Sequence, residues 1–148
     1  MKILEIMTSD PACCSPDATL RDVSRMMVEY DCGQIPVCNE KDEIIGVITD
    51  RDIVCRAVAE GMDMSTTRVS ECMTTSPITV TADTKLEDAI NLMEKNMIRR
   101  LPVMSENGTL CGMLSQADIA CKGNQDLLAE VVQEVSQPTE HASLIKEI

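Results

Sequence analysis

The chain has 148 residues, an apolar content of 44% and a formal net charge of −12. This length fits one domain, or two small subdomains that share a core, and the negative charge disfavours binding to nucleic acid or to an anionic membrane. No segment approaches the roughly 18 apolar residues of a membrane-spanning helix. Residues 1–7 do not resemble an export signal, so we expect a cytoplasmic protein.

The chain has one Tyr and no Phe or Trp, so aliphatic side chains, Met and Cys must fill the core. The eight cysteines include no Cys-x-x-Cys pair, and the only histidine is His141. We therefore expect no zinc site of the usual kind and thiols that pack mostly as small hydrophobic groups. No Ser-His-Asp set or Cys-His pair suggests an enzyme, so we expect no catalytic residues and no obligatory cofactor.

An internal duplication organises the chain. Residues 7–53 match residues 73–119 without a gap at a constant offset of 66, with 13 identical positions. We expect a first repeat over 3–61, a polar linker over 62–70, a second repeat over 71–123, and an amphipathic helix with a tail over 124–148. A duplication of this kind predicts a pseudo-two-fold axis.

Each repeat predicts the same order of elements. An extended segment comes first (12–15 or 78–81), and Asp17 or Asp83 then precedes a helix that it could cap. The apolar residues of this helix recur at helical spacing. They are Leu20, Val23, Met26, Met27 and Tyr30 in the first copy, and Leu86, Ala89, Ile90, Met93 and Met97 in the second.

Two predicted strands follow in each repeat. The first runs through 35–37 or 101–103, and its proline makes it short or places it at a sheet edge. The second covers 43–48 or 110–114 and contains Gly46 or Gly112, where a backbone or a ligand could approach closely. A second helix then ends near Gly61 or Gly123. Beyond the repeats, residues 126–137 predict one more amphipathic helix, which Pro138 stops.

The junction between the second strand and the second helix is Thr49-x-x-Asp52 in one copy and Ser115-x-x-Asp118 in the other. A hydroxyl residue followed three positions later by an acid is typical of a capping box. The same geometry also suits a nucleotide, because a helix N-terminus attracts phosphate and a fixed carboxylate can bind ribose hydroxyls. Both interpretations remain open on this pattern.

Three arginines lie close to these junctions in sequence: Arg51, Arg99 and Arg100. In so acidic a chain they could neutralise the phosphates of a ligand. The alternative is ordinary surface pairing with Asp and Glu. Phosphate donors, ribose acceptors and a flanking apolar slot together favour a nucleotide site.

The repeat resembles the cystathionine-β-synthase-type (CBS) domain. The resemblance rests on Gly46 to Ile53, on the two proline strands and on the two hydroxyl-x-x-Asp junctions, and it covers roughly residues 3–121. It implies an α/β (α+β) fold of two pseudo-symmetric β-α-β-β-α repeats, which form one Bateman module as in small stand-alone bacterial proteins. It also implies a homodimer.

The family resemblance implies an adenosyl ligand (AMP, ADP, ATP, NAD or S-adenosylmethionine) in clefts between the repeats. Asp52 and Asp118 would hold ribose hydroxyls, and Thr49 and Ser115 would touch phosphate or ribose. The segments 12–14 and 78–80 would frame adenine. The complete set of expected binding residues is Thr49, Arg51, Asp52, Ile78, Thr79, Val80, Arg99, Arg100, Leu101, Pro102, Ser115, Asp118, Ile35 and Pro36.

The two copies differ where binding is expected. Gly33-Gln34 replaces Arg99-Arg100, and Asp50-Arg51 replaces Gln116-Ala117, so the clefts should be inequivalent and the second copy is the stronger candidate. Cys13-Cys14 replaces Thr79-Val80, and we expect Cys13 to approach Cys38 closely enough for a disulfide.

These observations favour a non-enzymatic sensor that binds an adenine nucleotide and signals to a separate effector protein. Two alternatives are kept: a protein–protein interaction module without a ligand, and a cysteine-based redox-responsive protein.

Overall fold

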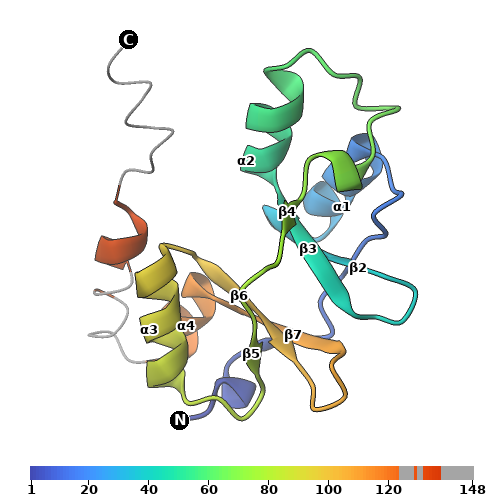
Figure 1. Ribbon diagram of the computed structural model, residues 1–148. Coiled ribbons are helices and arrows are strands. Elements are labelled where there is room, and N and C mark those ends of the chain that lie inside the picture. The colour runs from blue at the N-terminus through green and yellow to red at the C-terminus, as the bar shows by residue number, and fades with distance from the viewer. Residues whose placement is uncertain (124–128, 130–131, 138–148) are drawn as a thin grey trace.

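The computed structural model describes residues 1–123, 129 and 132–137 of the chain and has two small sheets with helices packed against them (Figure 1). The α+β class and the expected order of elements in each repeat are confirmed. The first repeat contains β1 (Thr8–Ser9), α1 (Leu20–Glu29), β2 (Gln34–Cys38), β3 (Ile44–Thr49) and α2 (Asp50–Ile53). The second contains β4 (Thr74–Thr75), β5 (Val80–Thr81), α3 (Leu86–Asn96), β6 (Arg100–Met104), β7 (Leu110–Ser115) and α4 (Gln116–Lys122).

The entry strand of each repeat belongs to the sheet of the other repeat. β1 pairs antiparallel with β7, and β4 pairs antiparallel with β3. The sheets therefore have the orders β1-β7-β6-β5 and β2-β3-β4, which interlocks the repeats. The second half of the predicted linker takes part in this exchange, because Thr67 and Val69 are buried and a 3₁₀ turn covers Val69–Glu71.

The two strand glycines make room for the crossing strands. A Cβ built on Gly46 would lie 2.8 Å from the backbone oxygen of Thr74, and a Cβ on Gly112 would lie 2.5 Å from the Met7 sulfur. The close approach to these glycines that the sequence predicts is therefore made by the crossing segments of the chain itself, at Thr74 and Met7. Pro36 lies in β2 at the edge of its sheet, as its missing donor requires.

The first helix of each repeat begins later than its aspartate suggests. Thr19 caps α1 in a capping box with Asp22, so the expected cap at Asp17 is wrong. α3 follows Lys85, which makes no side-chain cap. Asp83 instead accepts a 2.6 Å hydrogen bond from Thr81 Oγ1, and this bond lowers the pKa of its carboxyl group.

Two apolar clusters form the core, one beneath each repeat. Leu20, Val23, Ile35 and Ile48 belong to the first cluster, and their counterparts Leu86, Ala89, Leu101 and Leu114 belong to the second. The crossing segments contribute Val69 and Cys72 to the first, and Ile3 and Ile6 to the second. The last residue of each predicted helix face is an exception, because Tyr30 and Met97 are exposed.

The C-terminal segment is described in part. Ala129 and residues 132–135 are helical, and Val135 is buried against the second core. The rest of the predicted helix over 126–137, together with Pro138 and His141, lies outside the described residues. Within the described part of the chain, no helix combines the length and the apolar character needed to cross a membrane.

Candidate functional site

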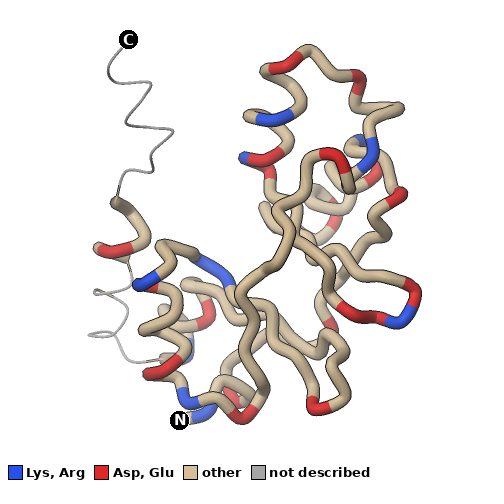
Figure 2. Tube along the Cα trace, in the orientation of Figure 1, with Lys and Arg blue, Asp and Glu red and all other residues tan. Residues whose placement is uncertain are grey.

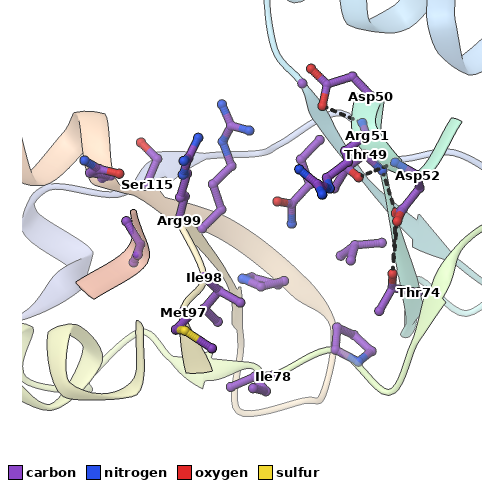
Figure 3. Close-up of a pocket in the computed structure, with 18 of the residues that line it drawn as sticks. Thr49, Asp50, Arg51, Asp52, Thr74, Ile78, Met97, Ile98, Arg99 and Ser115 are labelled. Carbon is purple, nitrogen blue, oxygen red and sulfur yellow. Dashed lines mark hydrogen bonds between the residues drawn. The ribbon is translucent and has the colours of Figure 1, made fainter. Parts of the chain in front are cut away.

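A cavity of about 990 Å³ lies between the two repeats and is lined by both of them. Figure 3 shows its walls: the β3–α2 junction faces a wall formed by the α3–β6 connection and the start of α4. The crossing segment after β4 and the described C-terminal residues complete the lining. The residues are Gly33, Gln34, Val47, Thr49, Asp50, Arg51, Asp52, Thr74, Ser76, Pro77, Ile78, Met97, Ile98, Arg99, Arg100, Pro102, Ser115, Gln116, Ala117, Ala120, Val132 and Val135.

Both junctions are capping boxes. The Asp52 backbone N–H donates to Thr49 Oγ1 at 3.0 Å, and the Thr49 N–H donates to Asp52 Oδ2 at 3.1 Å. The same pair of bonds joins Ser115 and Asp118 at 3.1 and 2.8 Å. The capping interpretation is therefore confirmed, and each box also places a hydroxyl residue in the cavity wall.

The two junction carboxylates are engaged differently. Asp52 accepts weak hydrogen bonds from Thr74 Oγ1 at 3.4 and 3.5 Å and lies 3.8 Å from the Arg56 guanidinium, with its side chain 12% exposed. Asp118 takes a further bond from Ser115 Oγ at 2.9 Å and a weak one from Thr8 at 3.4 Å. Only Asp52 of the two lines the cavity.

The cavity wall is locally basic in an acidic protein. Arg51, Arg99 and Arg100 line it together with two acids, Asp50 and Asp52, which gives the wall a formal charge of +1. Figure 2 shows basic positions on both sides of this space, at α2 and at the α3–β6 connection. Within the described residues, none of the three arginines has a carboxylate oxygen within 4.0 Å. The alternative interpretation, surface pairing of these arginines with Asp and Glu, is therefore not seen among the described residues.

The two helix starts present different backbone groups to the cavity. The Asp50 and Gln116 N–H groups donate to Gly33 O and Arg99 O, each at 2.9 Å. The next N–H in the first copy, that of Arg51, donates to Asp50 Oδ1 at 2.8 Å. Its counterpart at Ala117 has no acceptor among the described residues. A donor that Asp50 occupies in the first copy is thus open in the second.

The structure separates the expected binding residues into two groups. Thr49, Arg51, Asp52, Ile78, Arg99, Arg100, Pro102 and Ser115 line the cavity. Thr79, Val80, Leu101, Asp118, Ile35 and Pro36 are not among the lining residues. Ile35 and Leu101 are 1% and 0% exposed because alternate strand residues point into the core, and Val80 is also buried there.

Sequence reasoning missed several lining residues. Met97 and Ile98 form apolar wall next to Arg99, and Ser76 and Pro77 enter it from the crossing segment. The exchange of β1 and β4 between sheets brings that segment to the cavity, and no local pattern signals the exchange. Gly33 and Gln34 could have been found, because the offset of 66 places them opposite Arg99 and Arg100.

The first copy's expected adenine wall lies elsewhere. Cys14 is buried in the first core, and Cys13 lines a second, smaller pocket of about 290 Å³ with Cys38. All eight cysteines are free thiols. Burial, with Cys13 nearby, raises the pKa of Cys14 to about 11 and that of Cys38 to about 12, so both thiols stay protonated near neutral pH.

Comparison with known proteins gives a consistent result. A family model described as the CBS domain matches residues 3–58 and 69–122. Hypoxic response protein 1 of Mycobacterium tuberculosis is 33% identical over 139 residues, covering 94% of this chain and 96% of that protein.

Two solved structures are also similar. Hypoxic Response Protein I with two coordinated zinc ions has a TM-score of 0.76 at 34% identity, covering 82% of this chain and 98% of that one. CBSX2 of Arabidopsis thaliana in complex with AMP has a TM-score of 0.71 at 26% identity, covering 81% and 93%. Among the described residues of this chain, no group of three or more His, Cys, Asp or Glu is placed to hold a metal ion.

Proposed function

The chain belongs to the CBS domain family as a tandem pair of repeats, and we propose that the cavity between the repeats binds an adenosine nucleotide and reports its occupancy to a separate effector protein. The observation that carries this proposal is a trio of arginines in the wall of a cavity shared by both repeats, none of which has an acidic partner among the described residues. The complex of CBSX2 with AMP supports an adenosyl ligand.

The size and lining of the cavity fit such a ligand. Small-molecule sites usually enclose about 300–1,000 Å³ and combine apolar walls with a few polar groups. Ile78, Met97 and Ile98 offer an apolar surface for a base. Arg99 and Arg100 lie beside them and would meet phosphate, because guanidinium groups bind phosphate oxygens in a bidentate manner.

The charge of the wall selects among adenosyl compounds. Three arginines favour AMP, ADP, ATP or NAD over S-adenosylmethionine, whose sulfonium group is cationic. The Ala117 N–H, which has no acceptor among the described residues, adds a donor on the same side as Arg99. We therefore place the phosphates of the ligand against the second repeat.

The proposed signalling depends on the fact that both repeats line the cavity. A ligand that contacts both repeats changes the free energy of their packing only if it binds two arrangements with different affinity. We propose that this shift passes through a homodimer to the effector, with no chemical step at the cavity. The protein would work as a sensor in the cytoplasm.

The test is a thermal-unfolding series with AMP, ADP, ATP, NAD and S-adenosylmethionine, because a ligand that binds only the folded state raises its stability. We expect the phosphate-bearing nucleotides to raise the unfolding midpoint. Arg100→Ala should reduce this shift, whereas Arg25→Ala, an exposed arginine of α1 outside the cavity, should not. With one Tyr and no Trp in the chain, any co-purified adenine would dominate its ultraviolet spectrum.

The interaction module without a ligand is the competing outcome. No midpoint shift with any of the five compounds, and no difference between Arg100→Ala and the control, would favour it. The cavity would then be a structural gap between repeats, and its three arginines would be available to an acidic protein segment.

A further inference from the structure

We propose that Cys13 and Cys38 are an oxidisable dithiol that forms a reversible disulfide beside the seam between the two repeats, away from the nucleotide cavity. The reagent class is a low-molecular-weight disulfide such as oxidised glutathione. The inference rests on the position of the two thiols and does not depend on the proposed nucleotide site.

Backbone pairing puts the two side chains on one face. Cys14 N–H donates to Pro36 O at 3.0 Å, and Cys38 N–H donates to Cys14 O at 3.0 Å, which makes Cys14 and Val37 partners in a parallel bridge. Partners in a bridge point to the same side, and neighbours along a strand point to opposite sides. Cys14 and Val37 face the core, so Cys13 and Cys38 share the other face.

The two thiols are neighbours on that face. Cys13 and Cys38 line the same small pocket, and the nearby Cys13 contributes to the raised pKa of Cys38. Cys13 is exposed, whereas Cys38 is 5% exposed. A reagent can therefore reach Cys13 first, and Cys38 is already positioned for the intramolecular step.

The pocket lies at the seam. Thr109 and Leu110 of the second repeat line it opposite the cysteines, and the Leu110 N–H donates to Asp42 O at 3.2 Å across the seam. The cysteines lie near the β2–β3 turn, whereas the cavity lies at the other end of these strands, at Gln34 and Thr49. In Figure 1 the β2–β3 and β6–β7 turns point away from α2 and α4.

The second repeat lacks this chemistry. Thr79 and Met104 occupy the positions that correspond to Cys13 and Cys38 at the offset of 66. The dithiol is therefore a property of the first repeat alone.

The reaction balances as two exchanges. The Cys13 thiolate attacks a sulfur of oxidised glutathione and releases one reduced glutathione, which leaves a mixed disulfide. The Cys38 thiol then loses its proton and displaces the second glutathione from Cys13. The protein loses two hydrogens to form one disulfide, and the oxidised glutathione becomes two reduced molecules.

The test starts from fully reduced protein that is exposed to oxidised glutathione under denaturant-free conditions. We expect a monomer whose intact mass falls by two hydrogens and whose cross-linked tryptic peptides span the Cys13 and Cys38 regions. Cys13→Ser and Cys38→Ser should abolish the cross-link. Cys14→Val and Cys32→Ser are the matched controls, because each removes the other thiol from one of the same two tryptic peptides.

A second readout is stability. The disulfide closes a loop from residue 13 to residue 38, so oxidation should raise the unfolding midpoint by roughly 5–10 °C and should not do so in the Cys13→Ser variant. Three results overturn the proposal: glutathione retained on Cys13 with Cys38 free, a cross-link that persists in Cys13→Ser, or a disulfide between two protein molecules. Nucleotide binding is measured separately, so failure of one proposal leaves the other standing.

Discussion

The two strand-to-helix junctions have the same capping-box conformation, but they present different hydrogen-bond donors to a ligand. In the first repeat, Asp50 accepts the Arg51 N–H at 2.8 Å and brings a negative charge to the helix start. In the second repeat, the corresponding Ala117 N–H has no acceptor in the part of the chain that the structure describes, and Arg99 stands where the first repeat has Gly33. A duplicated cap has thus kept its structural role in both copies while only one copy presents a donor-rich wall.

The difference between Gly33 and Arg99 is matched by a difference in the neighbouring residue, which is Asp50 in the first repeat and Gln116 in the second. A Cβ on Gly33 would lie 2.8 Å from Asp50 Oδ2, so Asp50 occupies space that a side chain at position 33 would need. The second repeat has the larger residue at Arg99 and a neutral partner at Gln116. Each pair is compatible within its own repeat, and this predicts that single swaps between repeats are costly.

The largest expected effect is a loss of stability when two core residues that the sequence assigns to the binding site are truncated. Ile35→Ala and Leu101→Ala should each lower the free energy of unfolding by about 2–5 kcal/mol, because both side chains are almost fully buried and truncation leaves a cavity. Chemical denaturation measures this loss. Nucleotide affinity of the folded variants should stay close to that of the parent. A strong loss of nucleotide affinity with normal stability would mean that these two side chains belong to the binding site.

The next effect tests the crossing strands. Gly46→Ala should cost about 1–3 kcal/mol of unfolding free energy, because the new Cβ would lie 2.8 Å from the backbone oxygen of Thr74. Gly112→Ala should cost less. Its nearest neighbour is the sulfur of the flexible Met7 side chain, and the Thr8 backbone oxygen lies at 3.2 Å. Equal losses, measured by urea titration, would contradict this difference between the repeats.

Much of the fold could be predicted from the sequence because duplication repeats each signal. The order of elements and the capping boxes follow from local patterns that occur twice. The proline signal holds only in part, because Pro36 lies in an edge strand and Pro102 lies in β6, which is paired on both sides. The exchange of β1 and β4 could not be predicted, since strand pairing between distant segments has no local signature. For the same reason, Ser76 and Pro77 were missed as lining residues.

The site could be predicted only where side chains point outward. Arg51, Arg99 and Arg100 were found because isolated basic residues stand out in an acidic chain. Ile35, Leu101 and Val80 were assigned to the site from their place beside the motif, but strand alternation directs them into the core. A one-residue difference along a strand separates a wall residue such as Pro102 from a core residue such as Leu101.

A smaller effect addresses the charge at the first helix start. Asp50→Asn keeps an oxygen that can accept the Arg51 N–H and removes the negative charge, so it should tighten nucleotide binding by about fivefold at low salt, which corresponds to about 1 kcal/mol. Calorimetric titration measures the affinity. Asp63→Asn is the control, because Asp63 also accepts a backbone N–H at 2.8 Å, that of Ser65, and lies outside the cavity. Equal gains in both variants would mean that net charge, and not the cavity, sets the affinity.

The smallest expected effect is a pH-dependent change in stability. It concerns a core position that is Cys14 in the first repeat and Val80 in the second. Burial raises the pKa of Cys14 from 9.0 to about 11, with a contribution from Cys13, so the folded state favours the protonated thiol more than the unfolded state does. Stability from this source is complete below about pH 9 and is lost as pH rises toward 11, because the unfolded chain releases the proton first. Between pH 7.5 and 9.5 the loss should stay below about 1 kcal/mol. Cys14→Val copies the second repeat and should remove this part of the alkaline decline, while Cys38 continues to contribute in both proteins. Urea titrations in reductant at the two pH values measure it, and an identical decline in parent and variant would show that the Cys14 thiol has no part in it.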